Sequence, residues 1–261
     1  MTKLHVEVSS HGPPLVLAHG FTQTGRLWGP FGAAMATNRR LFAVDLPGHG
    51  DSADIRADLS AGGRLLLGAT SGEIGVSEGD HAPFDLVGYS LGARFALHAA
   101  LADPARIRRL VLIGGTAGIE DEERRQARRA RDDAMAAELE ASGDVAGFLD
   151  RWLSSPMFAG LPPAAAGASE RARNTAAGLA SSLRLAGTGT QAPLWGELAS
   201  LEVPTLLVAG ANDPRFAAYG ARMAKLLPHA VVALVPGAGH AAHLHQPAVC
   251  ARIVDTWLGT P

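Results

Sequence analysis

The stretch FDLVGYSLGAR, which runs from Phe84 to Arg94, decides the fold. Its apolar first part, Phe84–Val87, is typical of a buried strand, and Gly88-Tyr89-Ser90-Leu91-Gly92 follows at once as a G-x-S-x-G pattern. The two glycines permit a strained strand-to-helix turn that exposes the serine hydroxyl at the carboxyl edge of a sheet. Leu91–Ala102 supplies the helix that such a turn requires. We therefore predict that Ser90 is a catalytic residue.

Other short apolar runs occur along the chain, and turns and helical stretches separate most of them. They are Leu15–Ala18, Leu41–Val44, Leu110–Ile113, Thr205–Ala209 and Val231–Val235. Continuous apolar runs, as opposed to alternating ones, are typical of parallel strands that are buried on both faces. Strands that alternate with helices predict an α/β fold with a mostly parallel sheet and helices on both of its faces.

The alternation stops between Ile113 and Thr205. This part of the chain predicts four helices: Asp121–Ala141, Val145–Trp152, Ser169–Leu185 and Pro193–Leu201. A helical block between two strands indicates an inserted cap, so we expect a core of residues 1–114 and 196–261 and a cap of residues 115–195. A second irregular region, Ala53–Pro83, is rich in Gly and Ser and gives only a weak helical signal near Leu59–Leu67.

Composition excludes several classes of protein. The 261 residues include 23 Lys and Arg against 25 Asp and Glu, and a net charge of −2 disfavours a nucleic-acid binder. No apolar run approaches the roughly 18 residues of a membrane span. The N-terminal residues lack a secretory pattern, and the single cysteine, Cys250, cannot form an internal disulfide. We expect a cytoplasmic protein.

A catalytic serine needs a base, and the base needs an orienting carboxylate. In folds with this turn the chain order is serine, acid, histidine. Position selects His240 among ten histidines, because it lies on a glycine loop after the last strand; Asp213 follows the preceding strand. Asp213 could instead serve only as the N-cap of the next helix. His240, His243 and His245 also suggest a metal cluster, but nothing nearby completes a ligand set, so no metal is predicted.

Hydrogen-bond donors that stabilise the negative charge developing on the substrate are also expected. The backbone N–H of Leu91 is one candidate, and the loop after an early strand, LAHGF, offers the N–H of Phe21. His19 in that loop is expected to be structural. Residues 45–53 formally match G-x-G-x-x-A, but their Pro- and Gly-rich context favours a tight structural loop over a nucleotide site.

Together these features resemble the α/β-hydrolase superfamily across nearly the whole chain. The resemblance rests on His19-Gly20-Phe21, Asp45–Gly50, Gly88–Gly92, Asp213 and His240. More narrowly, the chain is similar to the 2-succinyl-6-hydroxy-2,4-cyclohexadiene-1-carboxylate synthases, lyases of menaquinone biosynthesis. That similarity rests on Gly88–Arg94, Gly114–Ile119 with the Arg-rich stretch after it, Trp152 with Pro156–Phe158, Arg173-Asn174, and Gly239–His243 with Gln246-Pro247. Ala93 stands where the family commonly has Gly.

The narrower resemblance implies elimination of pyruvate from a succinyl-cyclohexene dicarboxylate. Ser90, activated by His240 and Asp213, would act as a base that removes a ring proton, and no cofactor would be needed. Because the substrate is a small polycarboxylate, arginines would bind it.

By resemblance, the substrate-binding residues are Arg94, Arg128 and Arg173, together with Tyr89 and Trp152. Arg94 also has independent support, because it lies four residues after Ser90 on the same helix and hence on the same face. Guanidinium groups suit bidentate carboxylate recognition. Within the arginine cluster, Arg124, Arg125 or Arg131 could take the place of Arg128.

Two other functions remain open at this stage. A serine hydrolase, either an esterase or a C–C bond hydrolase, would use the same triad for covalent catalysis. A non-catalytic ligand receptor on the same scaffold is the second alternative; the complete set of Ser90, Asp213 and His240 counts against it but does not exclude it.

Overall fold

The computed structural model describes residues 2–70 and 82–259, so part of the irregular region and the extreme ends of the predicted core lie outside the described residues. The strands are β1 (Val6–Ser9), β2 (Pro14–Ala18), β3 (Arg40–Val44), β4 (Phe84–Tyr89), β5 (Ile107–Ile113), β6 (Thr205–Gly210) and β7 (Ala230–Val235). The α-helices are α1 (Gly29–Met35), α2 (Leu59–Leu67), α3 (Leu91–Ala102), α4 (Glu122–Ser142), α5 (Val145–Leu153), α6 (Pro163–Ala166), α7 (Ala168–Arg171), α8 (Ala176–Ala186), α9 (Pro214–Ala224), α10 (Ala242–His245) and α11 (Pro247–Gly259). Short 3₁₀ turns occupy Gly50–Ser52, Pro104–Arg106, Pro156–Phe158 and Leu198–Ser200.

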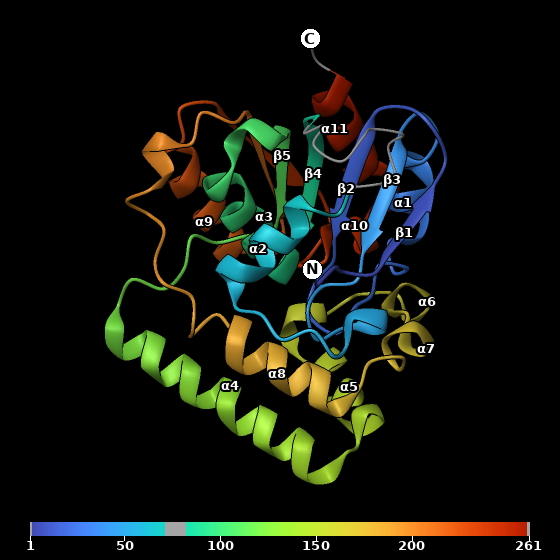
Figure 1. The fold of residues 1–261 in the computed structure, drawn as a ribbon, viewed down its shortest axis with the longest axis vertical. Coiled ribbons are helices and arrows are strands. Elements are labelled where there is room, and N and C mark those ends of the chain that lie inside the picture. Colours follow the sequence, from blue (N-terminus) through green and yellow to red (C-terminus); the bar gives the residue numbers. More distant parts are fainter. Residues whose placement is uncertain (1, 71–81, 260–261) are drawn as a thin grey trace.

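The described residues form one seven-stranded sheet in the order β1-β3-β2-β4-β5-β6-β7 (Figure 1). All neighbouring strands are parallel except β1, which pairs antiparallel with β3. The predicted α/β fold is thus confirmed, and the six predicted strands are present. Strand β1 was not predicted, because its sequence VEVS is short and only half apolar.

Alternate side chains of each central strand enter two separate cores. On β2, Val16 and Ala18 join a cluster with residues of α2, α3 and α9, whereas Leu15 and Leu17 join a cluster with residues of α1, α10 and α11. Successive side chains of a strand point to opposite faces of the sheet. A strand that is buried on both faces therefore needs apolar residues at successive positions, which accounts for the continuous apolar runs in the sequence. Each face of the sheet is therefore covered by helices.

The sheet creates a binding crevice by its topology. Strand β2 pairs with β3 on one side and with β4 on the other, so the connections after these strands leave in opposite directions. Ligands of open α/β sheets bind outside the carboxyl ends of the strands at such a switch point. The loop that contains Phe21 and the turn at Ser90 leave from the carboxyl ends of β2 and β4.

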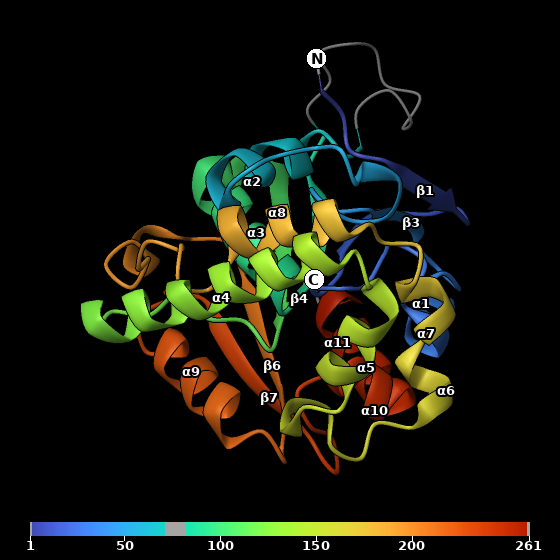
Figure 2. The same ribbon diagram turned by 90° about the horizontal axis from the view of Figure 1, so that it is seen from below.

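The chain between β5 and β6 is helical, as predicted. Helices α4, α5 and α8 lie together at one end of the sheet (Figures 1 and 2). They share a small apolar cluster of their own, formed by Ala136, Leu139, Phe148, Leu179, Ala180 and Leu183. Ala117, Phe158, Leu194 and Trp195 join the two main cores instead, so the division into a core and a cap of residues 115–195 stays a prediction.

Two predicted cap helices differ in the structure. The helix expected over Ser169–Leu185 is broken, because the Thr175 side chain accepts from the Gly178 N–H at 3.0 Å and caps a new helix there. The prediction of a helix over Pro193–Leu201 is wrong, because only the 3₁₀ turn Leu198–Ser200 forms there. Leu194, Trp195 and Leu198 enter the main core instead, and the indole of Trp195 donates to the Gly118 carbonyl at 3.0 Å.

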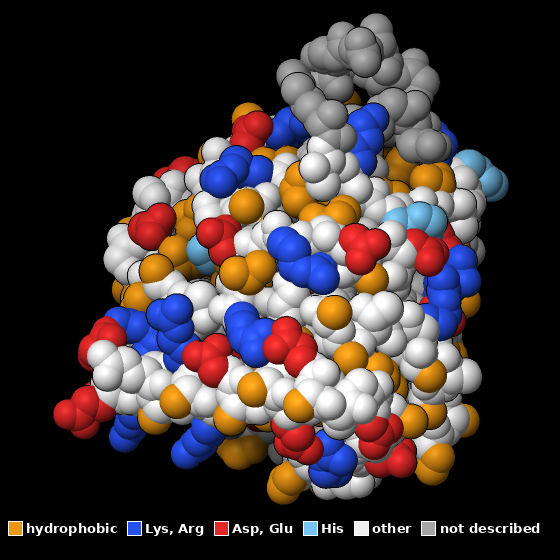
Figure 3. Space-filling view, turned by 60° about the horizontal axis from the view of Figure 1, so that its bottom comes forward, with side chains coloured by type: hydrophobic (Ala, Val, Ile, Leu, Met, Phe, Trp, Pro, Cys, Tyr) orange, Lys and Arg blue, Asp and Glu red, His pale blue; other side chains and the backbone are white. Residues whose placement is uncertain are grey.

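Helix α4 carries most of the dense charge run on the cap. Arg125 pairs with Glu122, and Glu140 pairs with Arg184 of α8. Figure 3 shows basic and acidic side chains intermixed over this side of the molecule. Most of these charges therefore form a solvated surface. Within the described residues, no helix has both the length and the apolar character that a membrane crossing would require.

Candidate active site

Ser90 lies on a strained turn between β4 and α3. Its φ of 52° and ψ of −104° are unusual for a residue other than glycine. A Cβ on Gly92 would lie 1.9 Å from the Ala18 carbonyl oxygen, and one on Gly88 would lie 2.6 Å from the Cα of Ala93. Both glycines are thus required for the backbone to pass this closely, which is the property expected of a nucleophile elbow.

Ser90, His240 and Asp213 form one hydrogen-bonded unit. Ser90 Oγ lies 3.0 Å from Nε2 of His240, and His240 Nδ1 lies 3.0 Å from Oδ2 of Asp213. With the ring proton on Nδ1, His240 donates to the carboxylate and accepts from the serine hydroxyl. This is the arrangement in which a histidine can take a proton from serine while a carboxylate orients the ring.

Asp213 has two structural roles at once. Its carboxylate also accepts from the Phe216 N–H at 3.2 Å and caps α9, so the N-cap interpretation and the triad interpretation hold together. Burial alone would raise the pKa of the Asp213 carboxyl, but the hydrogen bonds from His240 and Phe216 outweigh it, and the pKa is lowered. The carboxylate therefore remains ionised beside His240.

Asp45 does not occupy the position beside His240 that Asp213 holds. Its carboxylate accepts from the backbone N–H groups of Gly25, at 2.6 Å, and Asp51, at 2.8 Å. It holds the predicted tight loop after β3. His19 is also structural: its Nε2 accepts from the Leu46 N–H at 3.0 Å, and burial lowers its pKa to about 4.

The two candidate oxyanion donors lie at the same cavity. Phe21 and Leu91 line it together with Ser90 and His240. Leu91 is the first residue of α3, where a backbone N–H has no partner within the helix. Among the described residues, neither the Phe21 nor the Leu91 amide donates a hydrogen bond to another group. Both amides are thus available to a ligand in the cavity.

Two of the three predicted arginines also line this cavity. Arg94 projects from α3 and Arg128 from α4, and the ring of Trp152 forms another part of the wall. Arg94 is 7% exposed and donates to the Ala186 carbonyl at 2.6 Å. Burial, and secondarily the positive charge of Arg128, lowers the Arg94 pKa to about 9, so the group remains cationic at neutral pH.

One carboxylate partly compensates this positive charge. Arg128 Nε donates to Oδ1 of Asp132 at 2.8 Å, while Oδ2 of the fully buried Asp132 has no partner among the described residues. An acidic side chain is therefore present beside the two arginines. An anionic ligand would add the second partner that Arg94 and Arg128 lack.

The structure does not bring Arg173 to this cavity. Its guanidinium pairs with Glu170 at 2.7 Å and with Asp51 at 3.0 Å, on the side of the β3 loop. The buried arginine of this segment is Arg171, which is 1% exposed. Tyr89 is buried and is not among the residues that line the cavity, and its ring centroid lies 4.4 Å from that of His243. The cavity geometry thus gives no support to substrate contacts by Arg173 or Tyr89.

Sequence reasoning missed several cavity residues. Arg215 and Phe216 follow Asp213 on α9, and the Phe216 ring lies 4.3 Å from that of His240. Their position directly after the predicted acid was a signal that could have found them. Ser182 of α8 also lines the cavity, with a buried hydroxyl that has no partner among the described residues. Nothing in the sequence distinguishes it from its neighbours.

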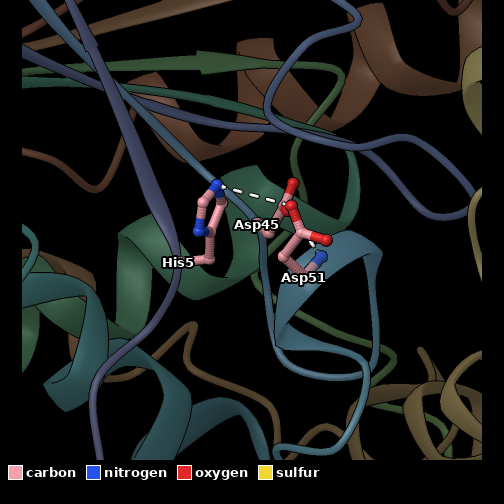
Figure 4. A group of neighbouring side chains, drawn as sticks. All are labelled: His5, Asp45 and Asp51. Atoms are coloured by element: carbon pink, nitrogen blue, oxygen red, sulfur yellow. Dashed lines mark hydrogen bonds and ion pairs between the residues drawn. The ribbon is translucent and has the colours of Figure 1, made fainter.

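A separate group of possible metal ligands lies at the β3 loop (Figure 4). The ligand atoms of His5, Asp45 and Asp51 lie within 4.8 Å of one another. Backbone amides and Arg173 already occupy these carboxylates, so the group is accounted for as an ion-pair network. His240, His243 and His245 do not form such a group in the part of the chain that the structure describes.

Comparison with known proteins shows the family of this chain. Residues 15–253 match the model of the alpha/beta hydrolase family. A 2-succinyl-6-hydroxy-2,4-cyclohexadiene-1-carboxylate synthase of Klebsiella pneumoniae is 36% identical over 90% of each chain. One of Escherichia coli is 34% identical over 94% of each chain, and one of Serratia proteamaculans is 32% identical over 100% of this chain and 98% of its own.

Solved structures show the same relationship. MenH from S. aureus matches with a TM-score of 0.86 and 28% identity, covering 99% of this chain and 98% of that one. A thermophilic esterase from Thermogutta terrifontis matches with a TM-score of 0.79 at 22% identity, covering 98% and 92%, and this shows the shared fold alone. The chain belongs to the alpha/beta hydrolase family and, within it, to the 2-succinyl-6-hydroxy-2,4-cyclohexadiene-1-carboxylate synthases.

Proposed function

We propose that this chain eliminates pyruvate from a succinyl-cyclohexene dicarboxylate to give 2-succinyl-6-hydroxy-2,4-cyclohexadiene-1-carboxylate, a step of menaquinone biosynthesis. The names of the relatives support this reaction. The observation that carries it is the presence of Arg94 and Arg128 in the same cavity as Ser90. Two cations beside the reactive hydroxyl suit a substrate with several carboxylates better than a neutral ester.

In this reaction Ser90 is the base. Its hydroxyl proton passes to Nε2 of His240 while Oγ accepts a proton from a ring carbon of the substrate. The electron pair of the broken C–H bond forms a ring double bond, and the C–O bond to the pyruvate unit breaks. The imidazolium of His240, stabilised by the Asp213 carboxylate, gives its proton to the enolate of pyruvate that leaves, while Ser90 Oγ keeps the proton taken from the ring, so both residues return to their starting states.

Negative charge that develops on a substrate oxygen needs donors. The free amides of Phe21 and Leu91 are suited to this, and the positive end of α3 adds to their effect. Arg94 and Arg128 bind carboxylates that do not react, and Trp152 packs against the apolar part of the ring. These assignments use only side chains and amides of the protein, and no cofactor is proposed.

The proposed partner is a small polycarboxylate, and we place the reaction in the cytoplasm. The net charge of −2 gives no support to binding of nucleic acid.

The direct test is turnover of the cyclohexene substrate by the purified chain. We expect pyruvate and the conjugated diene product to form in equal amounts, followed by coupled oxidation of pyruvate and by ultraviolet absorbance. A panel of small neutral esters is the comparison. Faster turnover of neutral esters than of the cyclohexene substrate would favour an esterase and reject the proposal.

A further inference from the structure

The loop after β2 contains a second strained residue. Thr22 is fully buried and adopts a φ of 66°, in the left-handed region that β-branched residues rarely adopt. It directly follows Phe21, whose amide is one of the two candidate oxyanion donors. Such strain persists only where the surroundings over-determine it, and it concentrates at functional sites. The contacts that hold Thr22 therefore decide where the Phe21 amide lies.

Every polar group of Thr22 is held from outside its own loop. The Thr22 N–H donates to Nε2 of His49 at 3.3 Å, and the Thr22 carbonyl accepts from Nδ2 of Asn174 at 2.8 Å. Its hydroxyl accepts from the guanidinium of Arg171, which also donates to the Phe21 carbonyl at 3.4 Å. Two of these three anchors come from the end of α7 and the segment after it: Arg171 and Asn174.

Asn174 joins three segments of the chain. Its Nδ2 also donates to the Arg171 carbonyl at 2.9 Å, and its Oδ1 accepts from the Gly50 N–H at 3.0 Å. The side chain is 4% exposed and makes these contacts through both ends of its amide. The loops after β2 and β3 are thereby tied to the cap through one uncharged group.

Neither Asn174 nor Arg171 lines the cavity that contains Ser90. An effect of Asn174 on the reaction must therefore pass through Thr22 and Phe21. We infer that Asn174, with Arg171 and His49, is a positioning residue of the oxyanion hole: it holds Thr22 in the left-handed conformation and so aims the Phe21 amide at the cavity. The inference rests on the proposed function only in the role given to the Phe21 amide.

Two substitutions separate positioning from folding. Asn174→Asp retains an acceptor for the Gly50 N–H at nearly the same size but removes the donor to the Thr22 carbonyl. Asn174→Ala removes both. The matched control is Thr175→Ala, which removes the N-cap of α8 at the next residue, where the described residues show no side-chain hydrogen bond to the β2 loop. Circular dichroism on each variant checks that the chain is folded.

The first measurement is the second-order rate at which a fluorophosphonate modifies Ser90. In that reaction the Ser90 Oγ–P bond forms, fluoride leaves, and the hydroxyl proton passes to His240, so it requires the oxyanion donors but not the natural substrate. The second is a pair of values for the natural reaction: kcat, and the Kd of the product.

We expect both Asn174 variants to lose about tenfold to 100-fold in phosphonylation rate and in kcat relative to Thr175→Ala, since a displacement of about 1 Å can cost this much. The product Kd should stay within about twofold, because the arginines of the cavity are untouched.

Equal phosphonylation rates in the Asn174 variants and in Thr175→Ala would overturn the inference, as would a loss confined to product affinity. A wild-type protein that reacts with the fluorophosphonate but does not turn over the cyclohexene substrate would reject the proposed function instead, and the comparison of phosphonylation rates would still decide the inference.

Discussion

The edge of the sheet and the cap contribute to the site by different means. At the sheet edge, Ser90, Asp213 and His240 follow the ends of hydrogen-bonded strands, and each makes a hydrogen bond to another member of the set. The cap contributes Arg128 from α4 and Trp152 from α5, two helices that share a small apolar cluster with α8. The reactive groups thus follow the strands of the sheet, whereas part of the proposed substrate recognition is on helices outside the sheet.

The largest expected effect lies on the sheet side of this comparison. Ser90→Ala removes the base and should lower kcat by about 10⁴-fold. The product Kd should change little, because Arg94, Arg128 and Trp152 remain in place. Stopped-flow kinetics together with calorimetric titration of the product measures both. A variant that retains a tenth of the wild-type kcat would show that another group is the base.

The second-largest loss of activity is expected when the orienting carboxylate of Asp213 is removed. Asp213→Asn keeps the N-cap of α9 but removes the negative charge beside His240, and we expect kcat to fall by about 10² to 10³. Asp45→Asn is the comparison: it should reduce stability through the Gly25 and Asp51 amides and leave kcat of the folded protein nearly unchanged. Equal losses of kcat in the two variants would contradict the assignment of the acid.

The arginines test the proposed substrate recognition, to which α3 contributes Arg94 and the cap contributes Arg128. Arg94→Ala should lower kcat/KM on the polycarboxylate by roughly 30-fold or more, because loss of one partner of a buried charged pair costs about 2–5 kcal/mol. Arg128→Ala should act in the same direction. Arg173→Ala should change kcat/KM by about twofold or less, since exposed ion pairs contribute little.

Kinetics on the polycarboxylate and on a neutral ester distinguishes recognition from general damage. If Arg94→Ala lowers turnover of both substrates equally, carboxylate recognition by Arg94 is wrong. If Arg173→Ala is as damaging as Arg94→Ala, the cap rearranges when substrate binds.

The last prediction concerns stability and its dependence on pH. Burial lowers the pKa of His19 to about 4 and those of His49 and His243 to about 3. Below about pH 6.5 the unfolded chain binds protons that the folded chain does not, so the free energy of unfolding should decrease as pH falls from 6.5 toward 4. Each histidine contributes up to about 1.4 kcal/mol per pH unit.

His243→Phe isolates one of these histidines. The His243 ring packs among Trp28, Phe31 and Tyr89 with neither nitrogen hydrogen-bonded among the described residues, so Phe can replace it. The free energy of unfolding, measured with urea at pH 7, 6 and 5, should depend less steeply on pH in the variant, and the difference in slope should correspond to about one proton. An unchanged slope would mean that His243 is not held neutral by the fold.

The same difference between the two regions explains what the sequence could predict. The triad positions follow from strand ends, because parallel strands bring their carboxyl ends to one edge, and G-x-S-x-G fixes which serine lies there. The cap lacks such a rule. Helix α7 ends at Arg171 and α8 begins only at Ala176, and Arg171 is buried whereas Arg173 pairs with Glu170 and Asp51 away from the cavity. Long-range contacts such as that of Asn174 with Thr22 leave no local pattern in the sequence.

One measurement tests the central claim, that Ser90 acts as a base toward a polycarboxylate, most directly. The protein is mixed with excess cyclohexene substrate, quenched within the first turnover, and the peptide that contains Ser90 is analysed by mass spectrometry. The account predicts unmodified Ser90 at every time point while pyruvate and diene accumulate together. An acyl group on Ser90 that forms and decays at the rate of turnover would contradict it, and the protein would then be a hydrolase.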